Sequence, residues 1–260
     1  MTADKSKTKI ILHGCMGKLG SAIHQLALKE KHAEIVCGVD ILGSGDGLAF
    51  PTYSDISHCD RDADVVVDCS VVEAVLPLLE FGTSRKVPLV ICTTGLSQEQ
   101  IDKVKQASEK VAVLLSANMS LGINLLVNLV QRVSRLLTDS SFDIEIIEKH
   151  HNQKVDAPSG TALALADAIN LSLDKQYEYV YDRTAERKKR NAKEIGIHTI
   201  RGGTIVGEHS VIYAGTDEII ELKHQALSKE VFAVGAMKAA QFLRGKPPGF
   251  YTMQDIIDEV

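Results

Sequence analysis

Residues 148 to 162, EKHHNQKVDAPSGTA, gather groups that can move protons and bind anions within a few positions. His150 and His151 are adjacent, Lys154 and Asp156 follow, and a Pro-Ser-Gly-Thr turn ends the segment. A histidine can act as an acid or base near neutral pH, and a lysine ammonium group is a proton donor. A solvated helix would scatter such residues among Glu, Gln and Ala. The cluster therefore predicts a site that protonates a substrate.

The apolar pattern after the turn predicts a helix, whose first N–H groups could bind a carboxylate, with Thr161 adding a hydroxyl. His150 and His151 end a predicted strand. Either their side chains point in opposite directions, or a bend brings both to the site. Asp156 has two interpretations, orienting the turn or pairing with Lys154. No metal is expected, because adjacent histidines chelate poorly and no Cys or Glu stands at ligand spacing.

The composition is that of an ordinary globular protein, with 260 residues, 45% hydrophobic and 24% charged, and a net charge of −5. This length allows one large domain or two modest ones. The net charge gives no attraction to nucleic acid or membranes, and no apolar run approaches the length of a bilayer span. The first residues lack the apolar segment of a secretory signal. We expect a cytoplasmic protein with a small-molecule partner.

Five cysteines stand at positions 15, 37, 59, 69 and 92, an odd number without a C-x-x-C pair. Most of them lie in or beside apolar, strand-like runs. We therefore expect buried, reduced thiols that pack as small hydrophobic groups. A catalytic thiol would need a nearby base or positive pole, and only Cys15 and Cys92 lie in loops that contain glycine.

The first 120 residues alternate short apolar runs with helical patterns, which is typical of parallel β-α-β units. Strands are predicted over 9–14, 34–40, 63–70, 88–95 and 111–118, and helices over 18–30, 72–86 and 97–110. A capping box at Ser97 and Gln100 opens the last of these helices. The predicted fold class is α/β, a doubly wound parallel sheet with helices on both faces.

The pattern changes after residue 120, and we place a second, α+β domain over residues 121–229. Its predicted elements are a helix over 122–137, a strand over 142–151, a helix over 159–173 and strand-like runs over 195–203, 204–215 and 218–227. They predict an antiparallel or mixed sheet with one face covered. A helix over 231–245 and a closing segment over 249–257 follow. The polar stretch 181–194 predicts a mobile loop, with a substrate lid or an oligomer contact as alternatives.

A glycine loop, HGCMGKLG, follows the first predicted strand and opens a helix. Gly14, Gly17 and Gly20 form a variant of the dinucleotide-binding fingerprint that lacks its early G-x-G pair. Glycines here allow a tight turn and let backbone N–H groups approach a pyrophosphate at the positive end of the helix. We predict dinucleotide binding, and a purely structural turn is the alternative.

Asp40 lies 20 residues beyond Gly20, at the end of the second predicted strand. A carboxylate there can accept hydrogen bonds from the ribose hydroxyls and would repel a 2′-phosphate. Because Ile41 follows and no arginine is close, the sequence favours NADH, with NADPH still possible. A solvated turn aspartate is the alternative.

Two further strand ends, CTTG at 92–95 and SANM at 116–119, point to the same edge of the sheet. Ligands bind at that edge in such folds. Thr93, Thr94 and Asn118 could contact a nicotinamide there, or could each cap the helix that follows.

The segment EIIEKHHNQKVDAPSGTAL resembles the signature of the 4-hydroxy-tetrahydrodipicolinate reductase family, also called dihydrodipicolinate reductase, of bacterial and plant lysine biosynthesis. The family pattern E-x-H-H-x-x-K-x-D-x-P-S-G-T is met at every motif position from Glu148 to Thr161. GCMGKLG, CTTG, SANMSLGIN, RGGTIVGEH and GFYTMQDII are similar to other family segments, so the resemblance covers the whole chain.

The resemblance implies a Rossmann-like domain over 1–120, completed by residues 230–260, and an inserted domain over 121–229 that binds substrate and forms a homotetramer. It implies NADH- or NADPH-dependent reduction of a cyclic imino dicarboxylate to tetrahydrodipicolinate, in the diaminopimelate route to lysine. The implied partners are a dicarboxylate substrate and further copies of the chain.

The resemblance also implies residue roles. His150 would be an acid/base, Lys154 the proton donor and His151 a substrate contact, while Gly160 and Thr161 would hold a substrate carboxylate. Whether His150 or Lys154 delivers the proton first is left open. The implied cofactor contacts are Gly14, Cys15, Met16, Gly17, Lys18, Leu19, Asp40, Cys92, Thr93, Thr94, Ser116, Ala117, Asn118 and Met119.

The chain departs from the family at a few positions outside the central cluster. Lys229 stands where arginine is usual, and the two are not equivalent at sites that need two parallel hydrogen bonds. Met119 stands where an aromatic residue is common. Other two-domain reductases fit less well: a semialdehyde dehydrogenase needs a nucleophilic cysteine, and no cysteine follows Cys92. A dinucleotide sensor without turnover would be expected to lose Lys154 or the histidines.

Overall fold

The computed structural model describes residues 7–43, 48–137, 142–184 and 187–259. The chain divides into two compact units. Unit 1 combines residues 1–121 with residues 230–260, and unit 2 is formed by residues 122–229. None of the helices that are described is both long and apolar enough to span a membrane.

Unit 1 is built on a seven-stranded sheet in which every pair of neighbours is parallel. Its order is β12-β6-β5-β4-β1-β2-β3, with β1 (Thr8–His13), β2 (Ala33–Val39), β3 (Thr52–Tyr53), β4 (Val65–Asp68), β5 (Leu89–Ile91), β6 (Ala112–Leu115) and β12 (Gly249–Tyr251). The direction of strand succession reverses between β1 and β4, which is where such sheets bind ligands. The predicted doubly wound, Rossmann-like sheet is confirmed.

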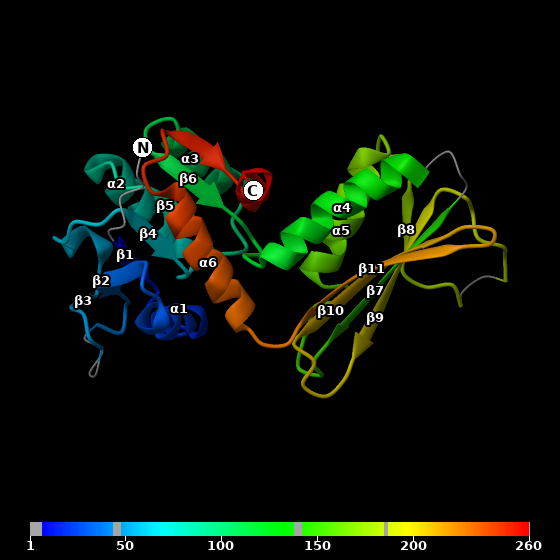
Figure 1. The fold of residues 1–260 in the computed structure, drawn as a ribbon, viewed down its shortest axis with the longest axis horizontal. Helices are drawn as coiled ribbons and strands as arrows, with labels where there is room; N and C mark the ends of the chain where they lie inside the picture. The colour runs from blue at the N-terminus through cyan, green and yellow to red at the C-terminus, as the bar shows by residue number, and fades with distance from the viewer. Residues whose placement is uncertain (1–6, 44–47, 138–141, 185–186, 260) are drawn as a thin grey trace. The chain divides into compact units, whose positions relative to one another are not determined.

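Helices cover both faces of this sheet (Figure 1). One apolar core holds residues of α1 (Lys18–Lys29) and α6 (Glu230–Leu243), and the other holds residues of α2 (Val75–Arg85) and α3 (Gln98–Ser108). Along β1, Ile10 and Leu12 join the first core and Ile11 joins the second. Burial on both faces explains why the strands read as continuous apolar runs rather than as alternating patterns.

The C-terminal segment of unit 1 adds a strand to the sheet that the N-terminal segment builds. β12 pairs in parallel with β6, so the closing segment adds an edge strand, and α7 (Met253–Asp258) follows it. The sequence predicted only a closing segment here, because three residues are too few to show a strand pattern. The predicted capping box of α3 is confirmed: Ser97 and Gln100 exchange side chain-to-backbone hydrogen bonds.

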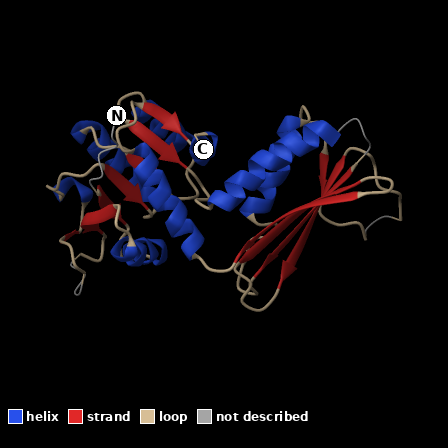
Figure 2. Cartoon of the chain, viewed as in Figure 1, coloured by secondary structure: helices blue, strands red, loops and turns tan. Residues whose placement is uncertain are grey.

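Unit 2 contains a mixed five-stranded sheet in the order β11-β10-β7-β9-β8. β7 (Asp143–His150) is antiparallel to β10 (Gly207–Ala214) and parallel to β9 (Glu194–Arg201); β11 (Ile219–Ala226) and β8 (Glu178–Val180) form the edges. Helices α4 (Leu121–Leu137) and α5 (Gly160–Ser172) lie along one face (Figures 1 and 2). The predicted mixed sheet with one covered face is confirmed; the short β8 was not predicted.

The polar stretch 181–194 is attached to this sheet by two arginines. Arg183 binds Glu194 at 2.7 Å and Glu145 at 2.8 Å. Arg190 binds Asp143 at 2.8 Å and donates to the backbone carbonyl of Glu194. The stretch was expected to be a mobile loop because it has few apolar residues. Ion pairs to strands that are distant in the sequence cannot be predicted from that composition, and mobility stays a prediction. Residues 185–186 lie outside the described part of the chain.

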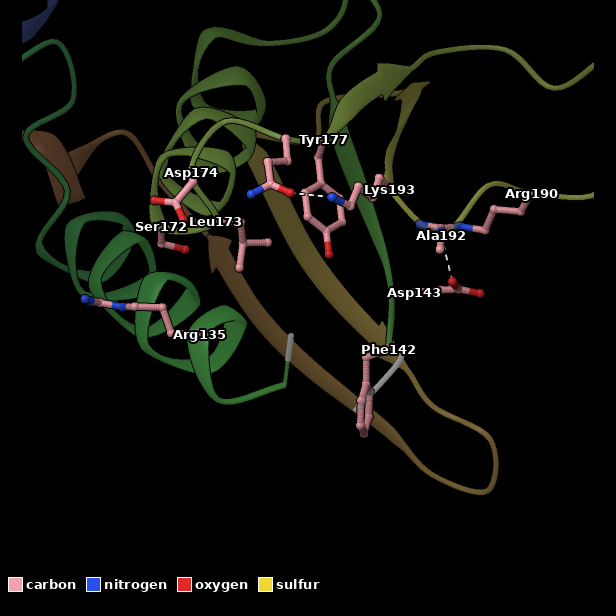
Figure 3. A pocket seen from close by; sticks show the side chains of 11 residues that line it. Arg135, Phe142, Asp143, Ser172, Leu173, Asp174, Tyr177, Arg190, Ala192 and Lys193 are labelled. Carbon is pink, nitrogen blue, oxygen red and sulfur yellow. Dashed lines mark hydrogen bonds and ion pairs between the residues drawn. The ribbon is translucent and has the colours of Figure 1, made fainter. Parts of the chain in front are cut away.

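A cavity of about 600 Å³ lies in unit 2 (Figure 3). Its lining includes Arg135 near the end of α4, Leu173 at the end of α5, and Tyr177 and Lys193 beyond them. None of the residues from 148 to 161 lines it. The predicted chemistry therefore belongs to a different part of unit 2.

Candidate active site

A fully buried carboxylate, that of Glu148, organises the motif on β7. Side chains alternate along this strand, so Glu148 and His150 share the face that the helices cover. Both Nη atoms of Arg201 lie 2.8 Å from the Glu148 oxygens. The Ser159 N–H and the Thr199 hydroxyl donate to Oε1 at 3.0 and 3.1 Å, and His150 Nδ1 lies 2.6 Å from Oε2. The buried charge is thus fully paired.

These partners keep Glu148 ionised. Burial alone would raise its pKa, but Arg201, His150 and the Ser159 N–H outweigh burial and lower the pKa to about 2. An ionised carboxylate can only accept hydrogen bonds, so its contact with His150 assigns a hydrogen to Nδ1. Nε2 is then the ring nitrogen through which the acid/base role predicted for His150 would act.

A second buried histidine, His209 on β10, packs against this arrangement. Its ring lies edge-on to that of His150, with 5.2 Å between centroids, and its Nε2 is 3.0 Å from Ser159 Oγ. Burial and the neighbouring His150 lower the pKa of His209 to about 4. His209 is therefore neutral at neutral pH and places no positive charge beside His150.

Lys154 is held in the turn that follows β7. Its N–H donates to the His151 carbonyl at 3.1 Å, and its Nζ lies 2.7 Å from Asp156 Oδ1. Arg201 donates to the Asp156 carbonyl at 2.6 Å, which ties the turn to β9. Of the two interpretations of Asp156, the structure contains the pairing with Lys154. That pairing, with a smaller contribution from the Gly160 N–H, lowers the pKa of Asp156.

The N-terminus of α5 opens directly after the turn. Ser159 is its N-cap, and its hydroxyl accepts from the Ala162 N–H at 3.2 Å. Gly160 is exposed, and a Cβ built on it would meet no atom within 4 Å. The α-carbon of Gly160 thus borders open space, at the positive end of a helix.

Contacts run through the motif from end to end. Glu148 touches His150, Ser159 and Arg201, and Arg201 reaches the Asp156 that pairs with Lys154. Of the predicted residues, His151 joins through its carbonyl, which accepts from the Lys154 N–H. The sequence predicted no role for Glu148, Arg201 or His209. The segment RGGTIVGEH contains Arg201 and His209, but a segment alone does not tell which residues their side chains contact.

The glycine loop of unit 1 has backbone geometry that other residues cannot adopt without strain. Gly14 has a φ of +78°, and a Cβ there would lie 2.7 Å from the Cys69 carbonyl oxygen. A Cβ on Gly20 would lie 2.2 Å from the Gly14 oxygen. Gly17 is the N-cap of α1 and has no side chain to cap it. The N–H groups of Gly14, Met16 and Gly17 donate to Val39, Asp40 and Gly14, which fixes the tight turn. The turn leads directly into the N-terminus of α1, and the positive end of a helix fits the pyrophosphate of a dinucleotide.

Asp40 joins this loop to the end of β2. Its Oδ2 accepts from the Met16 N–H at 3.0 Å, and its Oδ1 accepts from the Leu42 N–H at 3.2 Å. The side chain is partly exposed, so both oxygens keep lone pairs for further donors. This placement matches the role of a ribose-binding carboxylate.

The other predicted cofactor residues fall into two groups. Four residues have buried side chains and can offer a cofactor little beyond backbone N–H and C=O groups: Cys15, Cys92, Thr93 and Met119. The Thr93 hydroxyl donates to Asp68 Oδ2 at 2.7 Å. Exposed or partly exposed positions are Met16, Gly17, Lys18, Leu19, Thr94, Ser116, Ala117 and Asn118. Cofactor contact remains a prediction for all of them.

A buried pair at the switch point was not predicted. His13 ends β1 and Asp68 ends β4, and His13 Nδ1 lies 2.9 Å from Asp68 Oδ1. Both are single polar residues at the ends of apolar runs, and only the parallel pairing of β1 with β4 reveals that they are neighbours. Over the described residues, no group of three or more His, Cys, Asp or Glu has an arrangement that could hold a metal ion.

Two family models cover this arrangement. The model for the N-terminus of dihydrodipicolinate reductase matches residues 8–119, and the model for its C-terminus matches residues 122–257. The chain belongs to the dihydrodipicolinate reductase family. It is therefore an oxidoreductase whose unit 1 carries a nucleotide-binding, Rossmann-type domain.

Relatives of the same family match along nearly their whole length. Proteins named 4-hydroxy-tetrahydrodipicolinate reductase from Caldanaerobacter subterraneus subsp. tengcongensis and from Clostridium novyi are each 51% identical, over 249 and 250 residues. Each match covers 96% of this chain and 98% of the relative. A protein of that name from Staphylococcus saprophyticus is 47% identical over 248 residues, covering 95% of this chain and all of the relative.

Solved structures share the fold. The dipicolinate-bound dihydrodipicolinate reductase from Paenisporosarcina sp. TG-14 aligns with a TM-score of 0.80 at 20% identity, covering 95% of this chain and 97% of that one. A scyllo-inositol dehydrogenase from Lactobacillus casei, with bound NAD(H) and scyllo-inositol, aligns with a TM-score of 0.57 at 15% identity, over 97% and 93% of the two chains. At these identities the likeness concerns the fold alone.

Replacing Glu148 by glutamine tests the buried ion pair through its pH dependence. Because the folded pKa is about 2 and the ordinary value is 4.5, wild-type Glu148 stabilises the fold above pH 4.5 and loses this effect as the pH falls toward 2. The difference corresponds to about 3 kcal/mol. We expect Glu148→Gln to lower the free energy of unfolding at pH 7 by about that amount, and the two proteins to converge as the pH falls to about 2.

Urea unfolding at a series of pH values gives the measurement. Glu80→Gln, at an exposed position on α2, is the matched control and should change the free energy of unfolding by less than about 0.5 kcal/mol throughout. Parallel pH profiles for Glu148→Gln and wild type would contradict the assignment.

Proposed function

We propose that this reductase converts 4-hydroxy-tetrahydrodipicolinate, by way of dihydrodipicolinate, to tetrahydrodipicolinate with NAD(P)H in the diaminopimelate route to lysine. The observation that carries the proposal is the connected set of contacts from Glu148 to Lys154 beside the N-terminus of α5. It occurs in a chain whose relatives at 51% identity bear the name of this reductase.

The substrate of this reaction carries two carboxylates, which need local positive groups in a chain of net negative charge. We assign one carboxylate to Lys154 and to the N–H groups and hydroxyl at Gly160 and Thr161, with His151 as a further contact. The Asp156 carboxylate supports this assignment, because it already contacts the Lys154 ammonium group and is stabilised by the Gly160 N–H. The turn from Lys154 to Gly160 therefore favours the binding of carboxylates.

Reduction of the conjugated imine requires a proton as well as a hydride. The reduced nicotinamide, when bound, supplies the hydride. Lys154 is the proton donor in our proposal, and His150 exchanges a proton through Nε2 while Glu148 holds its Nδ1 hydrogen. The neutral His209 packs against the ring of His150 and places no positive charge beside it.

For the cofactor we propose that the pyrophosphate lies at the glycine loop from Gly14 to Leu19 and that Asp40 accepts from the adenosine ribose. An ionised Asp40 would repel a 2′-phosphate, which favours NADH over NADPH. The strand ends at 92–94 and 116–119 are proposed to contact the nicotinamide side, mainly through backbone groups.

We further propose that unit 2 forms a homotetramer through the sheet face opposite α4 and α5. Among the residues described in unit 2, no helix covers that face. The exposed Ile200 and Ile219 lie on it together with charged residues such as Lys223 and Glu221. Burying apolar side chains of this kind stabilises subunit contacts.

The activity is tested with substrate made in place from pyruvate and aspartate semialdehyde by the partner synthase. We expect oxidation of NADH or NADPH only when the synthase product is present. Lys154→Ala and His150→Ala should each lower kcat by about 10² to 10⁴, because each removes a group that moves a proton.

Lys103→Ala is the matched control for the lysine variant. Lys103 is an exposed lysine on α3 of unit 1, paired with Glu99 at 2.8 Å. The variant should retain kcat within about twofold. Absence of oxidation with either cofactor, in a protein that still binds the dinucleotide, would overturn the proposal.

Cofactor preference is tested by Asp40→Asn, which keeps an oxygen to accept from the Met16 N–H but removes the charge. We expect the ratio of kcat/KM for NADH over that for NADPH to fall about tenfold, equivalent to about 1.4 kcal/mol. Glu34→Gln, at an exposed position on the same strand, should leave the ratio unchanged. An unchanged ratio in Asp40→Asn would assign the preference to other groups.

The oligomer is tested by sedimentation equilibrium of the whole protein. We expect the mass of four chains for wild type and a smaller species for Ile200→Asp combined with Ile219→Asp, since a charge in an apolar contact is costly. A monomeric wild-type protein, or a double variant that remains tetrameric, would contradict the proposed interface.

A further inference from the structure

Two cysteines of unit 1 lie in direct contact. Cys37 belongs to β2, and Cys59 follows the short 3-10 helix η1 (Ile56–His58). Their Sγ atoms are 3.0 Å apart, and the side chains are 0% and 2% exposed. Since a disulfide bond is about 2.05 Å long, a movement of about 1 Å would join them.

The contact makes the two thiols chemically unequal. Their hydrogen bond lowers the pKa of Cys59 and raises that of Cys37, because a Cys37 S–H that donates to Cys59 stabilises a Cys59 thiolate. The guanidinium of Arg85, which donates to the Cys59 carbonyl at 3.2 Å, also favours this thiolate. Cys59 is thus the nucleophile of the pair and Cys37 the resolving thiol.

The remaining cysteines lack these features. Burial is the main cause of a raised pKa at Cys15, to about 11, and of raised pKa values at Cys69 and Cys92. Thiols of this kind react slowly with oxidants, since the thiolate is the reactive form.

A small oxidant can reach Cys59 by a local opening. Its neighbours His58 and Asp60 are exposed, and η1 is a single turn whose cap is the hydrogen bond from the Ser57 N–H to Asp55 at 2.8 Å. Single surface turns open at much lower free energy than the sheet beneath them. The burial of Cys59 is therefore shallow, although its static exposure is small.

We propose that Cys37 and Cys59 are a redox-responsive pair that closes to a disulfide when the protein meets hydrogen peroxide. The Cys59 thiolate attacks one peroxide oxygen, and the O–O bond breaks to give a sulfenic acid and hydroxide. The Cys37 sulfur then attacks the Cys59 sulfur, the S–O bond breaks, and water leaves. The proton that Cys59 lost on ionisation converts the hydroxide to a second water. Two thiols lose two electrons, and one peroxide gains them.

The expected consequence is protection rather than loss of cofactor binding. Cys37 and Cys59 lie in the core that also holds α2 and α3 residues, whereas Cys15 of the glycine loop lies in the other core. The bond closes a loop of the chain that contains Asp40 and ties η1 to β2, which restricts the unfolded state. It also removes Cys59 from further, irreversible oxidation.

The test treats the reduced whole protein with hydrogen peroxide, quenches it with acid, alkylates it and maps the peptides by mass. We expect wild type to lose the mass of two hydrogen atoms and to yield one peptide link, between Cys37 and Cys59, that dithiothreitol reverses. Cys69→Ser, a matched replacement of another thiol in unit 1, should form the same link. Cys59→Ser should form none, and Cys37→Ser should accumulate a sulfenic acid at Cys59 that dimedone traps.

Three outcomes would overturn the proposal: full alkylation of all five cysteines after peroxide, oxidation of Cys59 beyond sulfenic acid without a link in wild type, or a link between other cysteines. NADH binding by the variants confirms that they are folded, and the mass readout does not depend on turnover. Thermal unfolding of the oxidised protein should occur about 5 °C or more above that of the reduced protein, with NADH affinity kept within about twofold.

Discussion

The ion pair between Glu148 and Arg201 is the constraint on which the candidate site depends. A buried carboxylate is tolerated only when its charge is compensated and its lone pairs are used. Here the compensation comes from β9 through Arg201 and from the start of α5 through the Ser159 N–H. One charge therefore holds three elements together. The orientation of His150 and the position of the Lys154 turn follow from it, because both are bound to this pair or to its arginine.

In unit 1 the shape of the glycine loop depends on backbone geometry instead of charge. The glycine loop approaches its neighbours so closely that a Cβ at Gly14 or Gly20 would collide with backbone atoms. The same lack of side chains leaves the N-terminus of α1 uncapped. Asp40 then positions the loop by accepting from the Met16 N–H, so the carboxylate that we assign to cofactor preference also stabilises the loop in the described structure. The proposed function thus uses one charge-based site and one backbone-based site.

Local patterns were predictable where they reflect burial or caps. Alternation along β7 placed His150 on one face, and the Ser97 capping box marked the start of α3. Contacts between distant segments were not. The attachment of residues 181–194 depends on Arg190 reaching β7, and the pairing of β12 with β6 joins segments more than a hundred residues apart. The hydroxyl of Thr93, expected at the cofactor, is turned to Asp68 because β4 and β5 are neighbours.

The sequence by itself predicted the doubly wound sheet and singled out the motif from Glu148 to Thr161, because periodicity and spacing are properties of neighbouring residues. Its resemblance to known sequences indicated the family. Tertiary structure decided which charges meet. It made Glu148 the centre of the motif, set His209 beside His150, and brought Cys37 to Cys59 across a gap of 22 residues. The physical reason is that the free energy of a charge or a thiol depends on what surrounds it in space, and those surroundings come from strands and helices that are remote along the chain.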